Sequence, residues 1–538
     1  MKFTTLSFLA LASSTIAGGT AKDSNLTVRT ATGTFTGLID PEFPHTRQWR
    51  SIPFAEPPVA TRRWLPPQKL SSDPSQHRYS TKFPPSCPQF VSAVESFWNL
   101  PLTKGNLIYN GAQNDTSGLV GEATSEDCLH LAVWRPTTEP PQGGFPVAFF
   151  MTGGGFVMGG VDLPWQNPAP WVERSQSHIV VSVNYRVGIF GFPNARGLVD
   201  GQQNLGILDQ RAALEWVYDN IEAFGGNPER ITQWGRSAGA MSADIHAYAW
   251  HEDPIAQAYY LESGNAVNTQ SSYRDPTYSN FSFVARHVGC EAPCGIGCDD
   301  HDGMAELDCM RQVSMIQISN FVGQYTDRGE RPPLAFGPIF DERILFSDYE
   351  AQAEAGKMAR RPTMMSMTAN EFSSLVLPWP PANLTKGPDQ ALVDSGTIPF
   401  AVCSLLNSTT WRNRLDVPVF RFQYAAEFPN LNVYDWLGAY HNAETPLIFG
   451  TYALLDHVAN TTDFQVEISH SMQDHILAFF EDPYHGPRKL GWEPMVTSDP
   501  DGGFLLRFGG SSGKVTERVD GIQVDGVCLG VGEHVPFP

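Results

Sequence analysis

The sequence is poor in positive charge and contains no hydrophobic run long enough to span a bilayer. Among 538 residues, 36 Lys and Arg stand against 57 Asp and Glu, which gives a formal net charge of -21. Because binding a phosphate backbone requires clustered Lys and Arg, nucleic acid is not expected as a partner. The apolar run near the start is too short to span, and the ending, GVGEHVPFP, lacks the apolar tail of a lipid-anchor signal. No transmembrane anchor is therefore expected.

Internal repeats, low-complexity tracts and interdomain linkers are also absent from the sequence. Apolar residues make up 41% and charged residues 17%, which is typical of a globular protein and excludes a disordered chain. We therefore expect residues 22–538 to form a single domain. The stretch from about 270 to 335 has mixed patterning, and we interpret it as an insertion on a larger core.

Residues 1–21 have the pattern of a signal peptide. A positive start at Lys2 is followed by an apolar stretch from Leu6 to Ala12 and by small residues suited to cleavage. Sequons for N-glycosylation agree with export and begin at Asn25, Asn114, Asn280, Asn383, Asn407 and Asn460. The protein is therefore expected to be secreted, and delivery to an internal secretory compartment remains an alternative.

The eight cysteines indicate disulfide bonds more than a metal site. An even number fits an oxidising compartment. Metal binding is the competing interpretation, because Cys290, Cys294, Cys298 and Cys309 cluster in the sequence. However, the cluster lacks paired Cys-x-x-Cys knuckles. We expect disulfides and no metal.

The middle of the chain alternates between strand and helix patterns. Residues 145–156, FPVAFFMTGGGF, form a short apolar run that leads into glycines, and residues 178–192 are typical of a strand buried on both faces. Apolar residues at helical spacing follow, from Leu214 to Phe224. A further strand, a tight turn and a helix cover residues 230–250. This order predicts an α/β fold with a doubly wound sheet.

The turn in this last unit, Gly235-Arg236-Ser237-Ala238-Gly239, has the G-x-S-x-G pattern of a nucleophile elbow. Such chemistry needs a serine raised on a sharp turn at the carboxyl end of a strand. The flanking glycines leave space for that turn. Its position between a predicted strand and a predicted helix favours Ser237 as a nucleophile. The alternative is a serine that only caps an ordinary helix.

A second candidate element is the glycine run Gly153-Gly154-Gly155, directly after an apolar strand and upstream of the elbow. Acyl transfer produces an oxyanion, and backbone N–H groups held in a glycine loop can stabilise it. Without any Cβ, this main chain can approach a substrate closely. The alternative is a flexible surface turn.

These motifs, with several longer blocks, carry a resemblance to the type-B carboxylesterase/lipase family, which includes cholinesterases and fungal lipases. The resemblance extends from about residue 28 to about residue 495. Its blocks are SIPFAEPPV (51–59), SEDCLHLAVWRP (125–136), MTGGGFVMGG (151–160), VSVNYRVGIFGF (181–192) and NLGILDQRAALEWVYDNIEAFGGNPERIT (204–232). It implies the α/β-hydrolase fold, with a large, mostly parallel central sheet and helices on both faces. Residues 22–538 would then be a single catalytic domain.

The resemblance also implies a Ser–acid–His triad and its accessories. Its acid falls on Glu371 in TANEF and its base on His441 in YHNAETPLIFG. The residues alone do not single out either one. The oxyanion would be held by the amides of Gly154, Gly155 and Ala238. No metal or cofactor is implied.

Disulfide pairs are implied by the same resemblance. They are Cys87–Cys128, Cys290–Cys309 and Cys403–Cys528, with Cys294–Cys298 as an additional small-loop bridge. The first would close a loop that forms part of the gorge rim or lid in this family.

Two residues depart from the family pattern. Arg236 replaces the usual acid before the nucleophile, and Thr152 replaces the usual His or Tyr before the glycines. A cation beside the triad lowers the pKa of the imidazolium unless it is neutralised. The counterpart of Glu444 belongs to a buried network beside the triad in the family. We therefore hypothesise that Arg236 pairs with Glu444; the alternative is that it reaches another acid and has no catalytic effect.

Within the loop between Cys87 and Cys128, Trp98 is the only tryptophan, and it is far from the choline-binding position of cholinesterases. Choline esters are thus not specially indicated. The loop's apolar side chains form either a lid over a lipophilic pocket or a segment packed on the body. They are Phe90, Val91, Phe97, Trp98, Leu100 and Leu102.

The leading hypothesis is a secreted serine hydrolase of lipophilic carboxylic esters, with triacylglycerol lipase activity as one option. The substrate would be a small-molecule or lipid ester. A tailoring esterase or acyltransferase for one metabolite uses the same acyl-enzyme and remains an alternative. A non-catalytic adhesion homologue is disfavoured, because such proteins have lost the serine whereas this chain keeps Ser237. Acyl-chain length, alcohol specificity and oligomeric state are not readable from the sequence.

Overall fold

The computed structural model describes residues 26–94, 96–99, 118–120, 123–198, 202–271, 275, 277–290, 303–376 and 386–538. Several predictions fall outside these ranges and stay predictions. They are the signal peptide at 1–21, the sequons at Asn25, Asn114 and Asn383, the loop residues Leu100 and Leu102, and the pair Cys294–Cys298.

An 11-stranded sheet runs through the molecule in the order β16-β15-β14-β13-β12-β11-β9-β10-β8-β4-β3. From β15 to β10 in this order, every neighbouring pair is parallel. The remaining strands add antiparallel edges at both sides. The strands are β3 (Leu38–Ile39), β4 (Thr46–Pro53), β8 (His130–Pro136), β9 (Phe145–Met151), β10 (Ile179–Val183), β11 (Gly226–Arg236), β12 (Ala258–Glu262), β13 (Thr363–Thr368), β14 (Val419–Tyr424), β15 (Phe504–Phe508) and β16 (Thr516–Asp520). The expected large, mostly parallel sheet is confirmed.

A hydrophobic core covers each face of this sheet. Alternate residues of the buried strands point to opposite faces and so contribute to different cores. On β9, Val147 and Phe149 join one hydrophobic core, whereas Ala148 and Phe150 join the other. The first core includes residues of α4 (Leu205–Asn220), α5 (Ala238–Ala249) and α11 (Ser404–Arg414). The second includes residues of α2 (Ala169–Ser175), α12 (Thr445–Phe449) and α13 (Asp463–Glu481). Continuous apolar runs such as β9 and β10 are the sequence signature of this double burial.

The elements expected around the elbow are present, with different bounds. The apolar stripe from Leu214 to Phe224 is buried, but the α-helix ends at Asn220 and a 3-10 turn, η5 (Ile221–Phe224), continues it. Gly225, at φ 81°, closes that turn. The following strand, β11, begins at Gly226, earlier than predicted, because its first part also pairs with β9 across an irregularity between Gly226 and Ile231.

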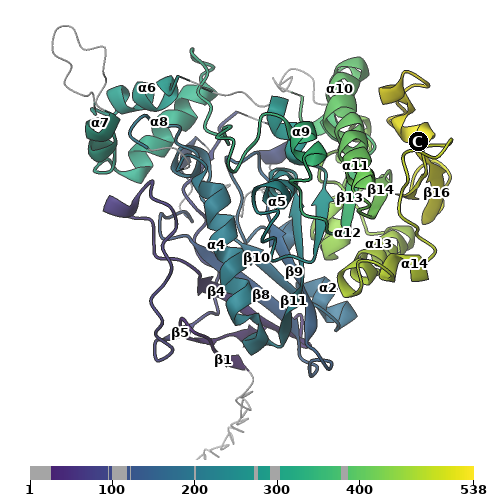
Figure 1. Cartoon of the computed structure of the whole chain (residues 1–538), viewed down its shortest axis with the longest axis horizontal. Helices are drawn as coiled ribbons and strands as arrows, with labels where there is room; N and C mark the ends of the chain where they lie inside the picture. The colour runs from purple at the N-terminus through teal and green to yellow at the C-terminus, as the bar shows by residue number, and fades with distance from the viewer. Residues whose placement is uncertain are drawn as a thin grey trace, which may run out of the picture.

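The region that we interpreted as an insertion lies between β12 and β13. It contains α6 (Ser279–His287), α7 (Gly303–Met310) and α8 (Met315–Asp327). Figure 1 shows these three helices grouped at one end of the molecule, with β16 towards the opposite end. The helices share a separate hydrophobic cluster, to which Phe281, Leu307 and Ile318 contribute. The sheet therefore continues from β12 to β13 without interruption.

Three disulfide bonds join the same cysteine pairs that the resemblance implies: Cys87–Cys128, Cys290–Cys309 and Cys403–Cys528. The last connects the π-helical segment η8 (Ile398–Cys403) to η11 (Gly526–Leu529) near the end of the chain. Its partners are 125 residues apart, whereas those of Cys290–Cys309 are 19 apart.

We expect the long-range bond to contribute more stability than the short-range one. The loop-closure model assigns about 5 kcal/mol to a loop of the length between Cys403 and Cys528, and about 3 kcal/mol to the loop between Cys290 and Cys309. Urea unfolding of the two double-serine variants checks this expectation. An equal or larger loss for the variant that lacks Cys290–Cys309 would contradict it.

Candidate active site

The candidate residues gather at the carboxyl ends of adjacent parallel strands. The glycine loop follows β9, and Ser237 follows β11, the neighbour of β9. Glu371 comes shortly after β13, and His441 lies in the long connection after β14. The chain order reverses at β9, since β10 lies on one side of it and β11 on the other. Ligands of open α/β sheets bind at such a switch point.

Ser237 stands on a strained turn. Its backbone adopts φ 54° and ψ -121°, between the end of β11 and the start of α5. Its N–H donates to the Glu262 carbonyl over 2.7 Å. A Cβ on Gly239 would lie 2.7 Å from the carbonyl carbon of Met151, so the elbow packs directly on β9. The Ser237 side chain makes no capping hydrogen bond to α5, which argues against the helix-cap interpretation.

Glu371 and His441 are in contact in the buried interior. The Nδ1 of His441 is hydrogen-bonded to one carboxylate oxygen of Glu371, and the other oxygen accepts the N–H of Thr368 over 2.8 Å. Burial raises the pKa of Glu371, but the charge and hydrogen bond of His441 outweigh it, so the pKa stays below its ordinary value. An ionised Glu371 accepts a hydrogen bond from the Nδ1–H of His441. This bond fixes the tautomer of the neutral ring in which Nε2 is unprotonated and can act as a base.

The third contact of the triad is not formed in this structure. Within the part of the chain that is described, the Ser237 hydroxyl makes no hydrogen bond to His441. Catalytic hydrogen bonds of free enzymes are often long and tighten only when substrate binds. The partial exposure of Ser237, between buried Arg236 and Ala238, leaves its hydroxyl open to a reactant.

The glycine loop is held in a defined conformation. Gly154 and Gly155 have φ angles of 122° and 61°, which side chains rarely adopt. The Gly154 carbonyl accepts the N–H of Val157 over 3.0 Å. Thr152, which precedes the loop, is buried; its hydroxyl donates to Gln166 over 2.7 Å, and its carbonyl accepts the Tyr185 hydroxyl over 2.8 Å. These bonds argue against a flexible surface turn.

The amide groups expected to bind the oxyanion are free to do so. No described residue accepts a hydrogen bond from the backbone N–H of Gly154, Gly155 or Ala238. The last of these is the first residue of α5, where helical N–H groups have no intrahelical acceptor.

The hypothesis of a direct Arg236–Glu444 ion pair is wrong. Both residues are buried, but among the described carboxylates none forms an ion pair with Arg236. Glu444 instead accepts the Ser263 hydroxyl over 3.0 Å on one oxygen. The alternative, a pair with another acid, is not formed either. The guanidinium lies against the glycine loop, where a Cβ on Gly153 would be 2.8 Å from its Nη2.

A third buried carboxyl, Glu262, completes the surroundings of the triad. Sequence patterns gave no signal for it, because its contacts come from distant segments. Trp234 Nε1–H donates to one of its oxygens over 2.8 Å, and the Thr445 hydroxyl donates to the other over 3.0 Å. Burial raises its pKa from 4.5 to about 7, although Arg236 acts in the opposite direction.

The raised pKa of Glu262 predicts a pH-dependent effect of the Glu262→Gln substitution. Between about pH 4.5 and 7 the unfolded chain ionises this carboxyl while the folded protein keeps the proton, so wild-type stability falls as pH rises. The free energy of unfolding of the variant relative to wild type should therefore increase over this range by up to roughly 3 kcal/mol. Thermal unfolding at a series of pH values measures the trend. A difference that does not change with pH would contradict it.

Two aromatic rings flank His441. Trp98 packs edge-on at a centroid distance of 6.5 Å and donates its indole N–H to the Ser374 carbonyl over 3.1 Å. Phe400, from segment η8, lies at 6.2 Å in a similar orientation. Sequence reasoning missed Phe400, because only the fold brings η8 next to the histidine loop.

The loop between Cys87 and Cys128 is packed onto the body where it is described. Phe97 is fully buried against Tyr440, with ring centroids 4.9 Å apart, and Phe90 lies against Gly323 of α8. Val91 is fully buried as well. These contacts favour packing over a mobile lid for this part of the loop.

Among the sequons, the structure argues against one. Asn280 is only 3% exposed, and its Nδ2 donates to the Ala335 carbonyl, so a glycan on this atom is incompatible with the packing. The prediction at Asn280 is therefore wrong for the folded protein. Asn407 and Asn460 are exposed and remain candidates.

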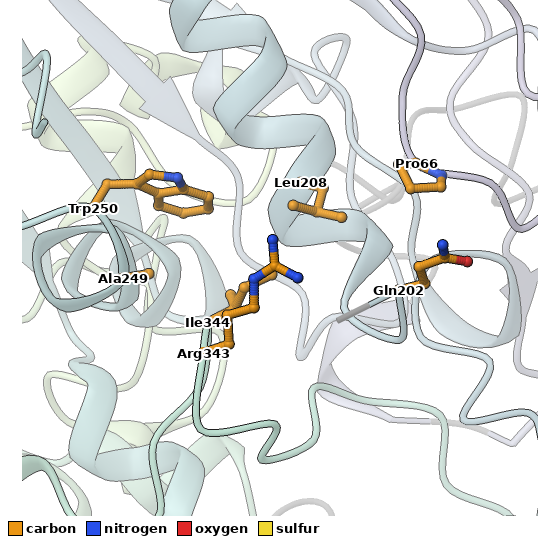
Figure 2. A pocket seen from close by; sticks show the side chains of 7 residues that line it. All are labelled: Pro66, Gln202, Leu208, Ala249, Trp250, Arg343 and Ile344. Atoms are coloured by element: carbon orange, nitrogen blue, oxygen red, sulfur yellow. The ribbon is translucent and has the colours of Figure 1, made fainter. Parts of the chain in front are cut away.

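A separate cavity of about 370 Å³ lies at the other end of α5. Figure 2 shows the side chains of Trp250, Leu208, Arg343 and Gln202 around it. Since α5 starts at Ala238 and has 12 residues, it carries the chain about 18 Å from the elbow to this cavity. The cavity is therefore distinct from the candidate active site.

Among the described residues, no helix has the length and apolarity needed to cross a membrane. Likewise, no three His, Cys, Asp or Glu side chains among them are grouped to hold a metal ion.

Comparison with known proteins gives consistent matches. Residues 24–395 match the model of the carboxylesterase family. The chain is 36% identical over 530 residues to a chlorogenic acid esterase of Aspergillus niger, which covers 94% of this chain and 95% of that protein. It is 33% identical over 523 residues to Secreted lipase 5 of Gibberella zeae, covering 94% and 93%. An acetylcholinesterase of Bungarus fasciatus is 35% identical over 354 residues, covering 65% of this chain and 54% of that protein.

Proposed function

Since the chain belongs to the carboxylesterase family and is a carboxylic ester hydrolase, we propose that Ser237 is its nucleophile, His441 its general base and Glu371 the carboxylate that orients His441. The observation that carries this assignment is the buried Glu371–His441 pair at the same sheet edge as the Ser237 elbow.

The reaction proceeds in two displacements. His441 Nε2 takes the hydroxyl proton as Ser237 Oγ bonds to the ester carbonyl carbon. The bond to the alcohol oxygen then breaks, and the alcohol leaves with the proton from His441. Water, activated by the same imidazole, attacks the acyl-enzyme and releases the acid. Glu371 stabilises the imidazolium that forms in each half.

The oxyanion of both tetrahedral intermediates is held by backbone N–H groups of Gly154, Gly155 and Ala238. Each such donor lowers the barrier by about 2.7–4 kcal/mol in a comparable hydrolase. The positive φ angles of Gly154 and Gly155, together with N–H groups that no described residue accepts, support this role.

For the substrate we propose lipophilic esters, with aromatic acyl groups favoured over long aliphatic ones. The rings of Trp98 and Phe400 beside His441 supply faces on which an aromatic acyl group stacks. The relative named a chlorogenic acid esterase covers nearly the whole chain and supports this preference. Lipase activity is the second candidate, supported by the relative named Secreted lipase 5.

Values of kcat/KM test the two candidates directly. The substrates are methyl hydroxycinnamates, p-nitrophenyl esters from acetyl to palmitoyl, and emulsified triacylglycerols. A preference for aromatic acyl groups predicts the highest kcat/KM for hydroxycinnamates. It also predicts that Trp98→Ala lowers kcat/KM for hydroxycinnamates more than for the aliphatic esters. A maximum at long acyl chains, with increased rates at the emulsion surface, would establish a lipase instead.

We further propose that the protein is exported, in line with relatives named as secreted lipases. Mass spectrometry of the culture medium should find a mature chain that starts near residue 22 and carries glycans at Asn407 or Asn460. Retention of an intact leader inside the cell would contradict this proposal.

A further inference from the structure

Arg236 is the least expected side chain near the triad. It is the last residue of β11, directly before Ser237, and it is 1% exposed. Its Nε and Nη2 have no hydrogen-bond partner among the described residues. Buried arginines usually pair with carboxylates, as Arg421 does with Asp525 over 2.6 Å on β14. Arg236 therefore carries a buried charge without the usual direct compensation.

The guanidinium instead packs on the main chain of the glycine loop. A Cβ on Gly153 would lie 2.8 Å from Nη2 and 2.9 Å from Cζ, so only glycine permits this approach. Gly153 immediately precedes Gly154, the first of the expected oxyanion donors. The positive charge therefore lies next to the loop whose N–H groups are proposed to hold the oxyanion.

The neighbouring acids do not neutralise this charge by contact. Glu262, the cross-strand neighbour of Arg236 in the β11–β12 register, uses both oxygens to accept from Trp234 and Thr445. Burial, and then the nearby Glu262 and Glu371 carboxyls, raise the pKa of Glu444 well above its ordinary value, which disfavours a negative charge on it. Burial lowers the pKa of Arg236 more than the carboxylates, Glu262 first, raise it. Keeping the Arg236 guanidinium charged in the folded protein therefore costs free energy of folding.

We propose that Arg236 is a positioning residue whose fixed positive charge, held against Gly153, stabilises the oxyanion of the tetrahedral intermediates through the glycine loop. This inference rests on the proposed roles of Ser237 and of the loop amides. The charge favours an anionic intermediate over an uncharged ester, so it acts on the transition state and little on substrate binding. If position 236 served only packing, an apolar side chain of similar length would give a more stable protein than arginine.

The test compares Arg236→Lys, which keeps the charge, with Arg236→Met and Arg236→Gln, which remove it. The neutral variants should lose roughly tenfold to hundredfold in kcat, with KM changed by less than about threefold. A trifluoromethyl ketone, to which Ser237 adds to form an anionic adduct, should bind more weakly by a similar factor. Arg236→Lys should recover most of both losses.

Stability provides a second, independent measurement. Because Arg236 has no ion-pair partner, Arg236→Met should unfold at the same temperature as wild type or higher. The matched control is Arg421→Met, which leaves Asp525 buried without its partner. It should lower the Tm and leave kcat unchanged, since Arg421 lies outside the site.

Each contrary outcome has a distinct meaning. Equal losses in Arg236→Lys and in the neutral variants would show a packing role and overturn the inference. Unchanged ketone affinity in folded neutral variants would overturn it as well. Activity retained in Ser237→Ala would instead overturn the proposed nucleophile, whatever the Arg236 variants do.

Discussion

Replacing Ser237 with alanine is expected to lower kcat for ester hydrolysis by about 10⁵- to 10⁶-fold, the scale seen when a serine hydrolase loses its nucleophile. Removal of one hydroxyl eliminates the acyl-enzyme route, while the strained turn and the glycine loop stay in place. Only slow reaction supported by the oxyanion donors would remain. Hydrolysis of a p-nitrophenyl ester measures the loss, and a serine-directed phosphonate should label the wild type but not the variant.

The matched control for this variant is Ser469→Ala. Ser469 is buried in α13, and its hydroxyl donates to the Leu447 carbonyl, away from the elbow. We expect a stability loss of about 1 kcal/mol and normal kcat. Substantial turnover by Ser237→Ala, with a normal circular dichroism spectrum, would refute the assignment of the nucleophile.

Replacing Gly239 with alanine is expected to disable the enzyme by a different route. The new Cβ would lie 2.7 Å from the carbonyl carbon of Met151 and 2.9 Å from the Thr152 oxygen, both in the rigid backbone at the end of β9. To avoid the clash, α5 must move off the sheet and carry Ser237 with it. We expect a destabilisation of about 4 kcal/mol or more, at the extreme of single substitutions, and loss of activity even in molecules that fold.

Gly337→Ala is the control for Gly239→Ala, because a Cβ at Gly337 would meet no atom within 4 Å. Its effect on stability should stay within about 0.5 kcal/mol. Urea unfolding and active-site titration of both variants provide the comparison. A Gly239→Ala protein with wild-type stability and a full complement of titratable sites would disprove the close packing of the elbow on β9.

The central strands and the elbow could be predicted from sequence because their signals are local. Buried parallel strands appear as continuous apolar runs, and a nucleophile elbow needs glycines two residues before and after its serine. The apolar stripe from Leu214 to Phe224 predicted one helix correctly, although its last turn is 3-10. Such boundaries depend on where the next strand must start.

The surroundings of the triad could not be predicted, because they depend on segments brought together only by the sheet. Glu444 was a reasonable partner for Arg236 by family analogy. In the structure, however, the Glu444 carboxyl accepts a hydrogen bond from the Ser263 hydroxyl, and the Arg236 guanidinium lies against Gly153. The proximity of Phe400 to His441 likewise follows from the placement of η8. The Asn280 sequon shows the same limit, since a triplet carries no information on burial.

The placement of the proposed catalytic groups after different strands also bears on biosynthesis. Ser237 leaves the ribosome 204 residues before His441 (441 − 237), which takes about 10–40 s at common elongation rates. During that interval the nascent chain has the proposed nucleophile without its proposed base. An incomplete chain would therefore have no hydrolytic activity. Activity is therefore expected to appear only after synthesis has passed His441 and the C-terminal part of the sheet has folded.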